Sequence, residues 1–86
     1  MYATKAFRRN LRRAEKRGKD LAKLWRIVMQ LLLEQPLEPR TRPHLLINWS
    51  TRCWECHIEP DWLLIWEQKD DALTLVRTGT HADLFG

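Results

Sequence analysis

The residues best able to do chemistry lie in the second half of the chain, and their types are those that move protons and bind phosphate. Three histidines can each take up or release a proton near neutral pH: His44, His57 and His81. Asp61 follows a proline in a predicted turn and could orient one of them. Arg77 could hold a phosphate and Phe85 could stack on a base. A proton acceptor, a proton donor and a cation are what RNA cleavage by its own 2′-hydroxyl requires.

Each of these residues also has a structural interpretation. A lone histidine is more often a hydrogen-bonded or surface residue than a catalyst, and Arg77 could be a surface cation on the last strand. Trp62 opens an apolar strand, so core packing is favoured over a substrate contact. Trp25 and Trp66 are expected in the core by the same reasoning. Phe85 could simply cover an edge of the sheet.

The segment Cys53-Trp54-Glu55-Cys56-His57 offers a rival function, because it matches the C-x-x-C-H pattern of haem attachment. On an extended strand, however, Cys53 and Cys56 point to opposite faces and cannot easily reach one porphyrin. A redox C-x-x-C pair belongs at a helix start, and four zinc ligands at suitable spacing are not visible. We therefore predict no metal and no cofactor.

Length and composition predict one domain spanning residues 1–86, with a small core. The hydrophobic fraction is 44% and the charged fraction 30%, which is typical of a globular protein. No segment approaches the roughly 20 apolar residues of a membrane span. The N-terminus is basic but no apolar run follows it, so no secretory signal is expected and a cytoplasmic location fits.

The charge is strongly uneven along the chain. Residues 1–42 hold 12 Lys or Arg against 4 Asp or Glu, and residues 43–86 hold 3 against 7. The front half therefore favours a nucleic acid or an acidic protein as partner, although a basic helix face can also be merely solvated. The candidate RNA-binding or ribosome-binding cations share one predicted helix: Arg8, Arg9, Arg12, Arg13, Lys16 and Arg17.

Two helices are predicted at the front of the chain. Thr4 can cap a helix over 5–17, in which Phe7, Leu11 and Ala14 form an apolar stripe. Asp20 can cap a second helix over 21–34, which a proline ends. The glycine between them allows a tight turn, so the two helices should form a hairpin.

The remainder predicts a sheet. Strands are expected over 45–49, 53–59, 62–67 and 73–78, with a very short one at 1–3 and one helical turn over 81–85. Turn residues separate consecutive strands, which favours an antiparallel meander. The predicted fold class is α+β, with an N-terminal helical hairpin packed on a small antiparallel sheet.

Four segments together resemble one known family. These are KRGKDLAKLW, RPHLL, ECHIEPDWLLIW and VRTGTHADLFG. They are similar to the YafQ branch of the RelE/ParE superfamily, the toxins of bacterial type II toxin–antitoxin pairs. The resemblance covers nearly the whole chain. It implies a RelE-like fold and a toxin that enters the ribosomal A site and cuts messenger RNA. It also implies a cognate antitoxin that blocks the toxin and, in complex with it, represses the operon by binding operator DNA.

The resemblance also implies which residues form the site, namely His44, His57, Asp61, Trp62, His81 and Phe85. By analogy His81 and His57 would transfer protons, and His44 and Asp61 would support them or bind phosphate. The chain departs from the family at Arg52, Cys53 and Trp54, where Gly-Tyr-Arg is usual, and at Leu45, where proline is usual. Loss of that arginine motivates a second hypothesis: a weakened or inactive toxin-like module that only binds an antitoxin.

Overall fold

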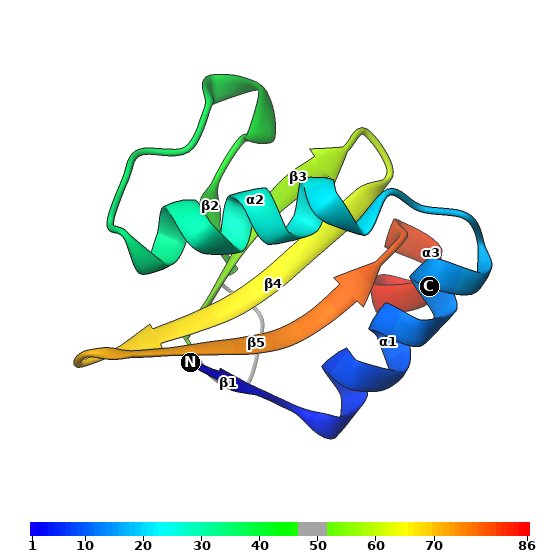
Figure 1. Ribbon diagram of the computed structural model, residues 1–86, viewed down its shortest axis with the longest axis horizontal. Coiled ribbons are helices and arrows are strands. Elements are labelled where there is room, and N and C mark those ends of the chain that lie inside the picture. Colours follow the sequence, from blue (N-terminus) through cyan, green and yellow to red (C-terminus); the bar gives the residue numbers. More distant parts are fainter. Residues whose placement is uncertain (47–51) are drawn as a thin grey trace.

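The computed structural model describes residues 1–46 and 52–86 and shows two helices packed on a sheet (Figure 1). The predicted α+β class is therefore confirmed. The predicted strand at 45–49 is only partly visible, because residues 47–51 lie outside the described residues. The elements in chain order are β1 (Tyr2–Ala3), α1 (Lys5–Lys16), α2 (Leu21–Leu32), η1 (Pro39–Thr41), β2 (His44–Leu46), β3 (Cys53–Glu59), β4 (Trp62–Lys69), β5 (Ala72–Gly79) and α3 (His81–Phe85).

The sheet has five strands in the order β1-β5-β4-β3-β2. The last four strands form the predicted antiparallel meander, whereas β1 lies parallel to β5, with Tyr2 opposite Thr74 and Ala3 opposite Leu75. The predicted antiparallel meander is confirmed, and β1 adds a parallel strand at its edge whose pairing was not predicted. A parallel pair needs a long crossover connection, and here nearly the whole domain supplies it.

The two long helices begin at the predicted caps. The Thr4 hydroxyl accepts a hydrogen bond from the Phe7 amide at 3.0 Å and donates one to the Val76 carbonyl at 2.7 Å, so it joins α1 to β5. The inner face of α1 is formed by Phe7, Asn10 and Ala14, since Leu11 is only half-buried. No helix in the described part of the chain is both long and apolar enough to cross a membrane.

Both helices cover the same face of the sheet, α1 beside β5 and α2 across β3 and β4 (Figure 1). The core between them and the sheet contains side chains from all these elements: Phe7, Ala14, Leu24, Ile27, Val28, Cys56, Trp62, Leu64, Trp66, Leu73 and Leu75. Trp66 is in the core as predicted. Trp25 is 39% exposed, so its assignment to the core was wrong. The helix turns Leu24 and Val28 toward the sheet instead.

Candidate functional site

The strand alternation places the chemical residues on the sheet face opposite the helices. Cys56 packs in the helix-covered core, so its neighbours Glu55 and His57 project from the other face. His44 lies directly opposite Glu55 across the β2–β3 pair. The predicted turn at Pro60-Asp61 and the predicted helical turn α3 are both present.

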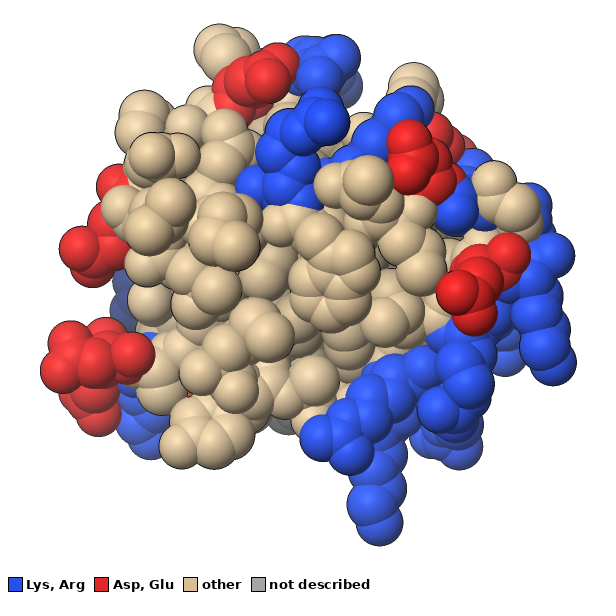
Figure 2. Space-filling model, in the orientation of Figure 1, with Lys and Arg blue, Asp and Glu red and all other residues tan. Residues whose placement is uncertain are grey.

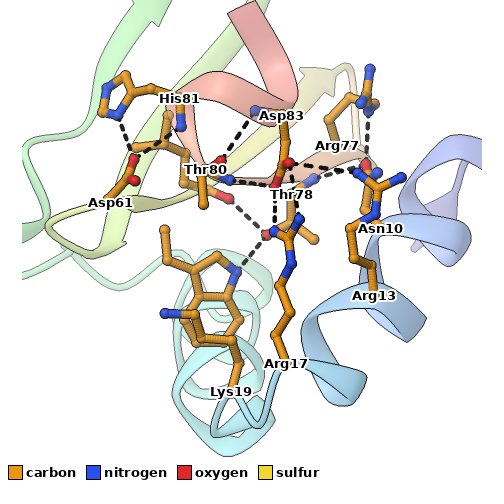
Figure 3. Close-up of polar contacts among 12 residues, drawn as sticks. Asn10, Arg13, Arg17, Lys19, Asp61, Arg77, Thr78, Thr80, His81 and Asp83 are labelled. Carbon is orange, nitrogen blue, oxygen red and sulfur yellow. Dashed lines mark hydrogen bonds and ion pairs between the residues drawn. The ribbon is translucent and has the colours of Figure 1, made fainter. Parts of the chain in front are cut away.

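His81 and Asp61 form the central contact of the site (Figure 3). The Asp61 Oδ1 atom accepts the His81 backbone N–H at 3.0 Å and lies 2.8 Å from its ring Nδ1. These contacts, the backbone bond first, hold the pKa of Asp61 below its ordinary value. Because an ionised carboxylate can only accept, Nδ1 must carry the hydrogen. With the hydrogen on Nδ1, the Nε2 atom of the neutral His81 ring is the one that can accept a proton.

His57 is held in the same way by a different acceptor. Its Nδ1 lies 3.2 Å from the Pro60 carbonyl, which again requires the hydrogen on Nδ1 and leaves Nε2 available. The His57 and His81 ring centroids are 5.8 Å apart, and the Phe85 ring lies 6.4 Å from His81. Phe85 is 50% exposed, which suits a side chain that contacts a ligand. The structure thus brings together four predicted residues from a strand, a turn and a short helix.

His44 forms an adjoining pair with Glu55, a residue that was not predicted to belong to the site. The His44 Nδ1 atom donates to the Arg42 carbonyl at 2.9 Å, and its Nε2 atom lies 3.1 Å from Glu55 Oε1. A proton on either of these two atoms would join the ring to the carboxyl group. Glu55 is only 5% exposed, and its Oε2 has no hydrogen-bond partner among the described residues. The alternation of Cys53, Glu55 and His57 was the signal that could have identified it.

Trp62 lies behind the site rather than in it. Its side chain is 1% exposed, and its indole N–H donates to the Thr78 hydroxyl at 3.0 Å. That hydroxyl donates in turn to the Leu63 carbonyl at 2.7 Å. The Lys19 ammonium lies 5.7 Å from the centroid of the indole ring. This burial corresponds to the core-packing interpretation, and a direct contact of Trp62 with substrate does not fit it.

The two cysteines are unsuited to haem attachment. Cys53 and Cys56 are not joined in a disulfide and both are fully buried, so neither sulfur can reach a porphyrin while the sheet is intact. Burial, and then the negative charge of Glu55, raise the pKa of Cys56 to about 12. This thiol therefore stays protonated and unreactive at neutral pH.

The basic residues divide into two groups. Arg77 donates from Nε to Asn10 Oδ1 at 2.7 Å, so it braces β5 against α1 (Figure 3). Arg17 binds Asp83 at 2.7 Å, and Arg13 lies 3.6 Å from the same carboxylate. The other predicted cations of α1 have no ion-pair partner in the part of the chain that is described: Arg8, Arg9, Arg12 and Lys16.

Asp83 fixes the short helix that carries His81. It completes a capping box with Thr80, accepting the Thr80 N–H at 3.0 Å while its own N–H donates to the Thr80 hydroxyl at 3.1 Å. The hydrogen bond from Arg17, followed by that from the Thr80 backbone, holds the pKa of Asp83 well below its usual range. The same contact raises the pKa of Arg17. Asp83 thus ties α3 to α1.

We expect Asp83→Asn to lower the free energy of unfolding at pH 7 by about 1 kcal/mol, because it loses a charge-assisted hydrogen bond. A carboxyl group whose pKa is depressed in the folded state stabilises above its ordinary pKa of about 4, and that contribution is lost as the pH falls through the folded-state value. Urea unfolding at pH 7 and at pH 3 measures the difference between wild type and variant. A difference that does not shrink at the lower pH would contradict this role.

Comparisons with known proteins agree with one another. Residues 1–86 match the family described as the bacterial toxin of type II toxin–antitoxin systems, YafQ. The chain is 40% identical over 82 residues to the mRNA interferase toxin YafQ of Escherichia coli strain B / BL21-DE3, covering 93% of this chain and 88% of that protein.

Two solved structures illustrate the likeness in three dimensions. The E. coli DinJ–YafQ complex superposes with a TM-score of 0.91 at 37% identity, covering 99% of this chain and 96% of that one. A metal-bound toxin from Helicobacter pylori gives a TM-score of 0.92 at 38% identity, covering 98% of this chain and 96% of that one. The described residues of the present chain contain no group of three His, Cys, Asp or Glu placed to hold a metal ion.

Proposed function

This chain belongs to the YafQ family of bacterial type II toxin–antitoxin toxins, and from that premise we propose that it is an endoribonuclease that cuts messenger RNA on the ribosome. The observation that carries the proposal is the pair His57 and His81. Their ring centroids lie 5.8 Å apart, and among the described residues neither Nε2 atom has a hydrogen-bond partner. Two proton-transfer groups close to each other are what cleavage by the 2′-hydroxyl needs.

The two histidines are assigned different roles by their partners. Asp61 accepts hydrogen bonds from the backbone N–H and the ring Nδ1 of His81 and so fixes its ring, which suits a positioned proton donor. His57 donates to a neutral carbonyl and suits the acceptor. The 2′-hydroxyl gives its proton to His57 Nε2, its oxygen attacks phosphorus, and the leaving 5′-oxygen takes the proton from His81 Nε2. The products are a 2′,3′-cyclic phosphate and a 5′-hydroxyl, and no step requires a metal.

The strand that carries His57 pairs regularly with β4 in a chain that departs from the family at Arg52, Cys53 and Trp54. The register between β3 and β4 is regular from Cys53 opposite Glu67 to His57 opposite Leu63. The shift in pairing comes only after His57, at the end of the strand. This regularity supports an active toxin over a module that only binds an antitoxin.

The direct test compares free and ribosome-bound substrate. Purified protein is added to one mRNA, either alone or in a translating extract, and new 5′ ends are mapped. In-frame cuts with 5′-hydroxyl ends, formed only during translation, are the expected result. Cuts of equal number in naked RNA would overturn ribosome dependence, and no cuts from folded protein would favour the antitoxin-binding module. If the folded protein makes no cuts, restoring Gly-Tyr-Arg at residues 52–54 should create cleavage activity.

The exposed cations of α1 are proposed to contact ribosomal RNA. Lys and Arg side chains gather over this helix, at the lower right of Figure 2. We expect Arg12→Glu to weaken ribosome binding. The logarithm of the binding constant should also fall less steeply with the logarithm of the salt concentration, with a slope smaller by about one. Co-sedimentation at several salt concentrations measures both.

Lys69→Glu is the matched control for Arg12→Glu. It makes the same change of charge at the end of β4, beside the β4–β5 turn and far along the chain from α1. Equal losses in the two variants would show that net charge, rather than the α1 surface, governs the interaction.

A cognate antitoxin is the proposed protein partner, since a YafQ relative of this chain crystallises in complex with DinJ. We propose that operator DNA is contacted only through that complex. Co-expression with the small neighbouring reading frame, followed by purification of the complex, tests the pairing; recovery of the toxin alone would contradict it.

A further inference from the structure

A groove of about 470 Å³ opens beside His57, on the edge of β3. It reaches α2 on one side and the loop around η1 on the other, and three cations line it: Lys23, Arg40 and Arg42. The strand β2 pairs only with residues 53–55 of β3, so within the described part of the chain the edge beyond His57 has no neighbouring strand. Ile58 and Pro60 give the groove apolar surface. The volume is within the range of small-ligand sites, roughly 300–1,000 Å³.

The positive charge in this groove is only partly balanced. Lys19 and Lys23 share the single carboxylate of Glu59, each at 3.0 Å, and this lowers the pKa of Glu59. Arg40 is paired with Glu38 at 2.8 Å. Arg42, by contrast, has an exposed side chain with no ion-pair partner among the described residues. An excess of cations beside a phosphate-cleaving pair attracts a polyanion.

The backbone at Arg42 gives an independent indication. Its φ is +47°, a left-handed conformation that residues other than glycine rarely adopt. The conformation is held at both ends, since the Arg42 N–H donates to the Pro39 carbonyl at 3.1 Å and the Arg42 carbonyl accepts from His44 Nδ1 at 2.9 Å. Strain of this kind persists only where the surrounding structure enforces it, and it clusters at functional sites. Here it places Arg42 on the groove that His57 also lines, and the Arg42 carbonyl orients His44.

We propose that this groove is a second phosphate subsite for single-stranded RNA, in which Arg42 binds the phosphodiester next to the one that is cut. The proposal rests on the proposed function and adds the path of the substrate beyond the scissile bond. The guanidinium forms a two-pronged hydrogen bond with the phosphate, and the adjoining ribose or base lies against Ile58 and Pro60. Binding there does not depend on base identity, because phosphate contacts carry no sequence information.

The test uses short RNAs with one 2′-deoxy nucleotide at the cleaved position, so that they bind without being cut. A dinucleotide spans only the scissile phosphate, whereas a trinucleotide adds a second one. Affinities are measured by titration in NMR, following the Arg42 and His81 signals. We expect the trinucleotide to bind about tenfold more tightly to the wild type, as one charge-assisted phosphate contact allows, and to shift both residues.

Arg42→Gly is the decisive variant because glycine adopts the same positive φ without strain. Its melting temperature should equal or exceed that of the wild type, while the tenfold advantage of the trinucleotide disappears. Arg42→Lys should recover part of that advantage. Arg40→Gly is the control, because it removes a cation that is already paired with Glu38. It should reduce the affinity advantage of the trinucleotide less than Arg42→Gly does.

The results separate this subsite from the proposed function. Equal binding of the two RNAs to the wild type, no measurable binding of either, or an unchanged advantage in Arg42→Gly would overturn the subsite even if the protein cleaves mRNA on ribosomes. Absence of ribosomal cleavage together with a tenfold effect at Arg42 would instead leave an RNA-binding groove on an inactive protein.

Discussion

The variant His81→Ala is expected to cleave mRNA about 10²- to 10⁴-fold more slowly than the wild type, the usual effect of losing a positioned proton-transfer group. In the proposed mechanism His81 Nε2 supplies the proton, and no other histidine is placed to replace it. His57 is the proposed acceptor, and the two nitrogens of His44 contact the Arg42 carbonyl and Glu55. The fold should be unaffected, because the cap of α3 is formed by Thr80 and Asp83.

Rates of A-site cleavage in a purified translation system measure this effect, with melting curves to show that each variant is folded. The matched control is His44→Ala, the same substitution in a histidine whose nitrogens contact Arg42 and Glu55. A smaller loss is expected there. If the two substitutions lower the cleavage rate equally, proton transfer cannot be assigned to His81 in preference to His44.

The second large effect is on stability. Trp62→Ala should lower the free energy of unfolding by about 3–5 kcal/mol, because it leaves a cavity in the core and removes the donor to the Thr78 hydroxyl. This is a large share of the total stability of a small domain, about 5–15 kcal/mol. Urea unfolding followed by circular dichroism measures the change.

Trp25→Ala provides the comparison, since it deletes the same side chain from a partly exposed position on α2. Its expected cost is about 1 kcal/mol or less. Similar costs at both positions would contradict the assignment of Trp62 to the core. The conservative variant Trp62→Phe separates the two interpretations further: loss of RNA affinity without loss of stability would indicate a direct substrate contact.

Local signals in the sequence predicted most of the fold correctly. The strand over 53–59 and the turn at Pro60-Asp61 follow from alternation and turn chemistry, and Thr4 and Asp20 mark helix starts because caps are local. The parallel pairing of β1 with β5 joins residues 72 positions apart and has no local signature. Trp25 illustrates a related limit: periodicity identifies the apolar face of a helix without showing how far the sheet extends beneath it.

The types of side chain in the candidate site were predicted from the sequence, but the contacts that support them were not. His57, Asp61 and His81 were identified because their types suit proton transfer and turns bring them together. Glu55 was missed because an acid in an alternating strand is usually exposed. The tie between Asp83 and Arg17 was missed because it joins elements that are close only after α1 has packed on β5.

The position of β5 between β1 and β4 has a consequence for the order of events during synthesis. The first strand and the first helix pack mainly on β5, which the ribosome makes some 70 residues later. Until then α1 has no sheet beneath it, and His81 has not been made. The nascent chain therefore carries β1 and α1 without their packing partner until β5 is made, and the His57–His81 pair can form only after that.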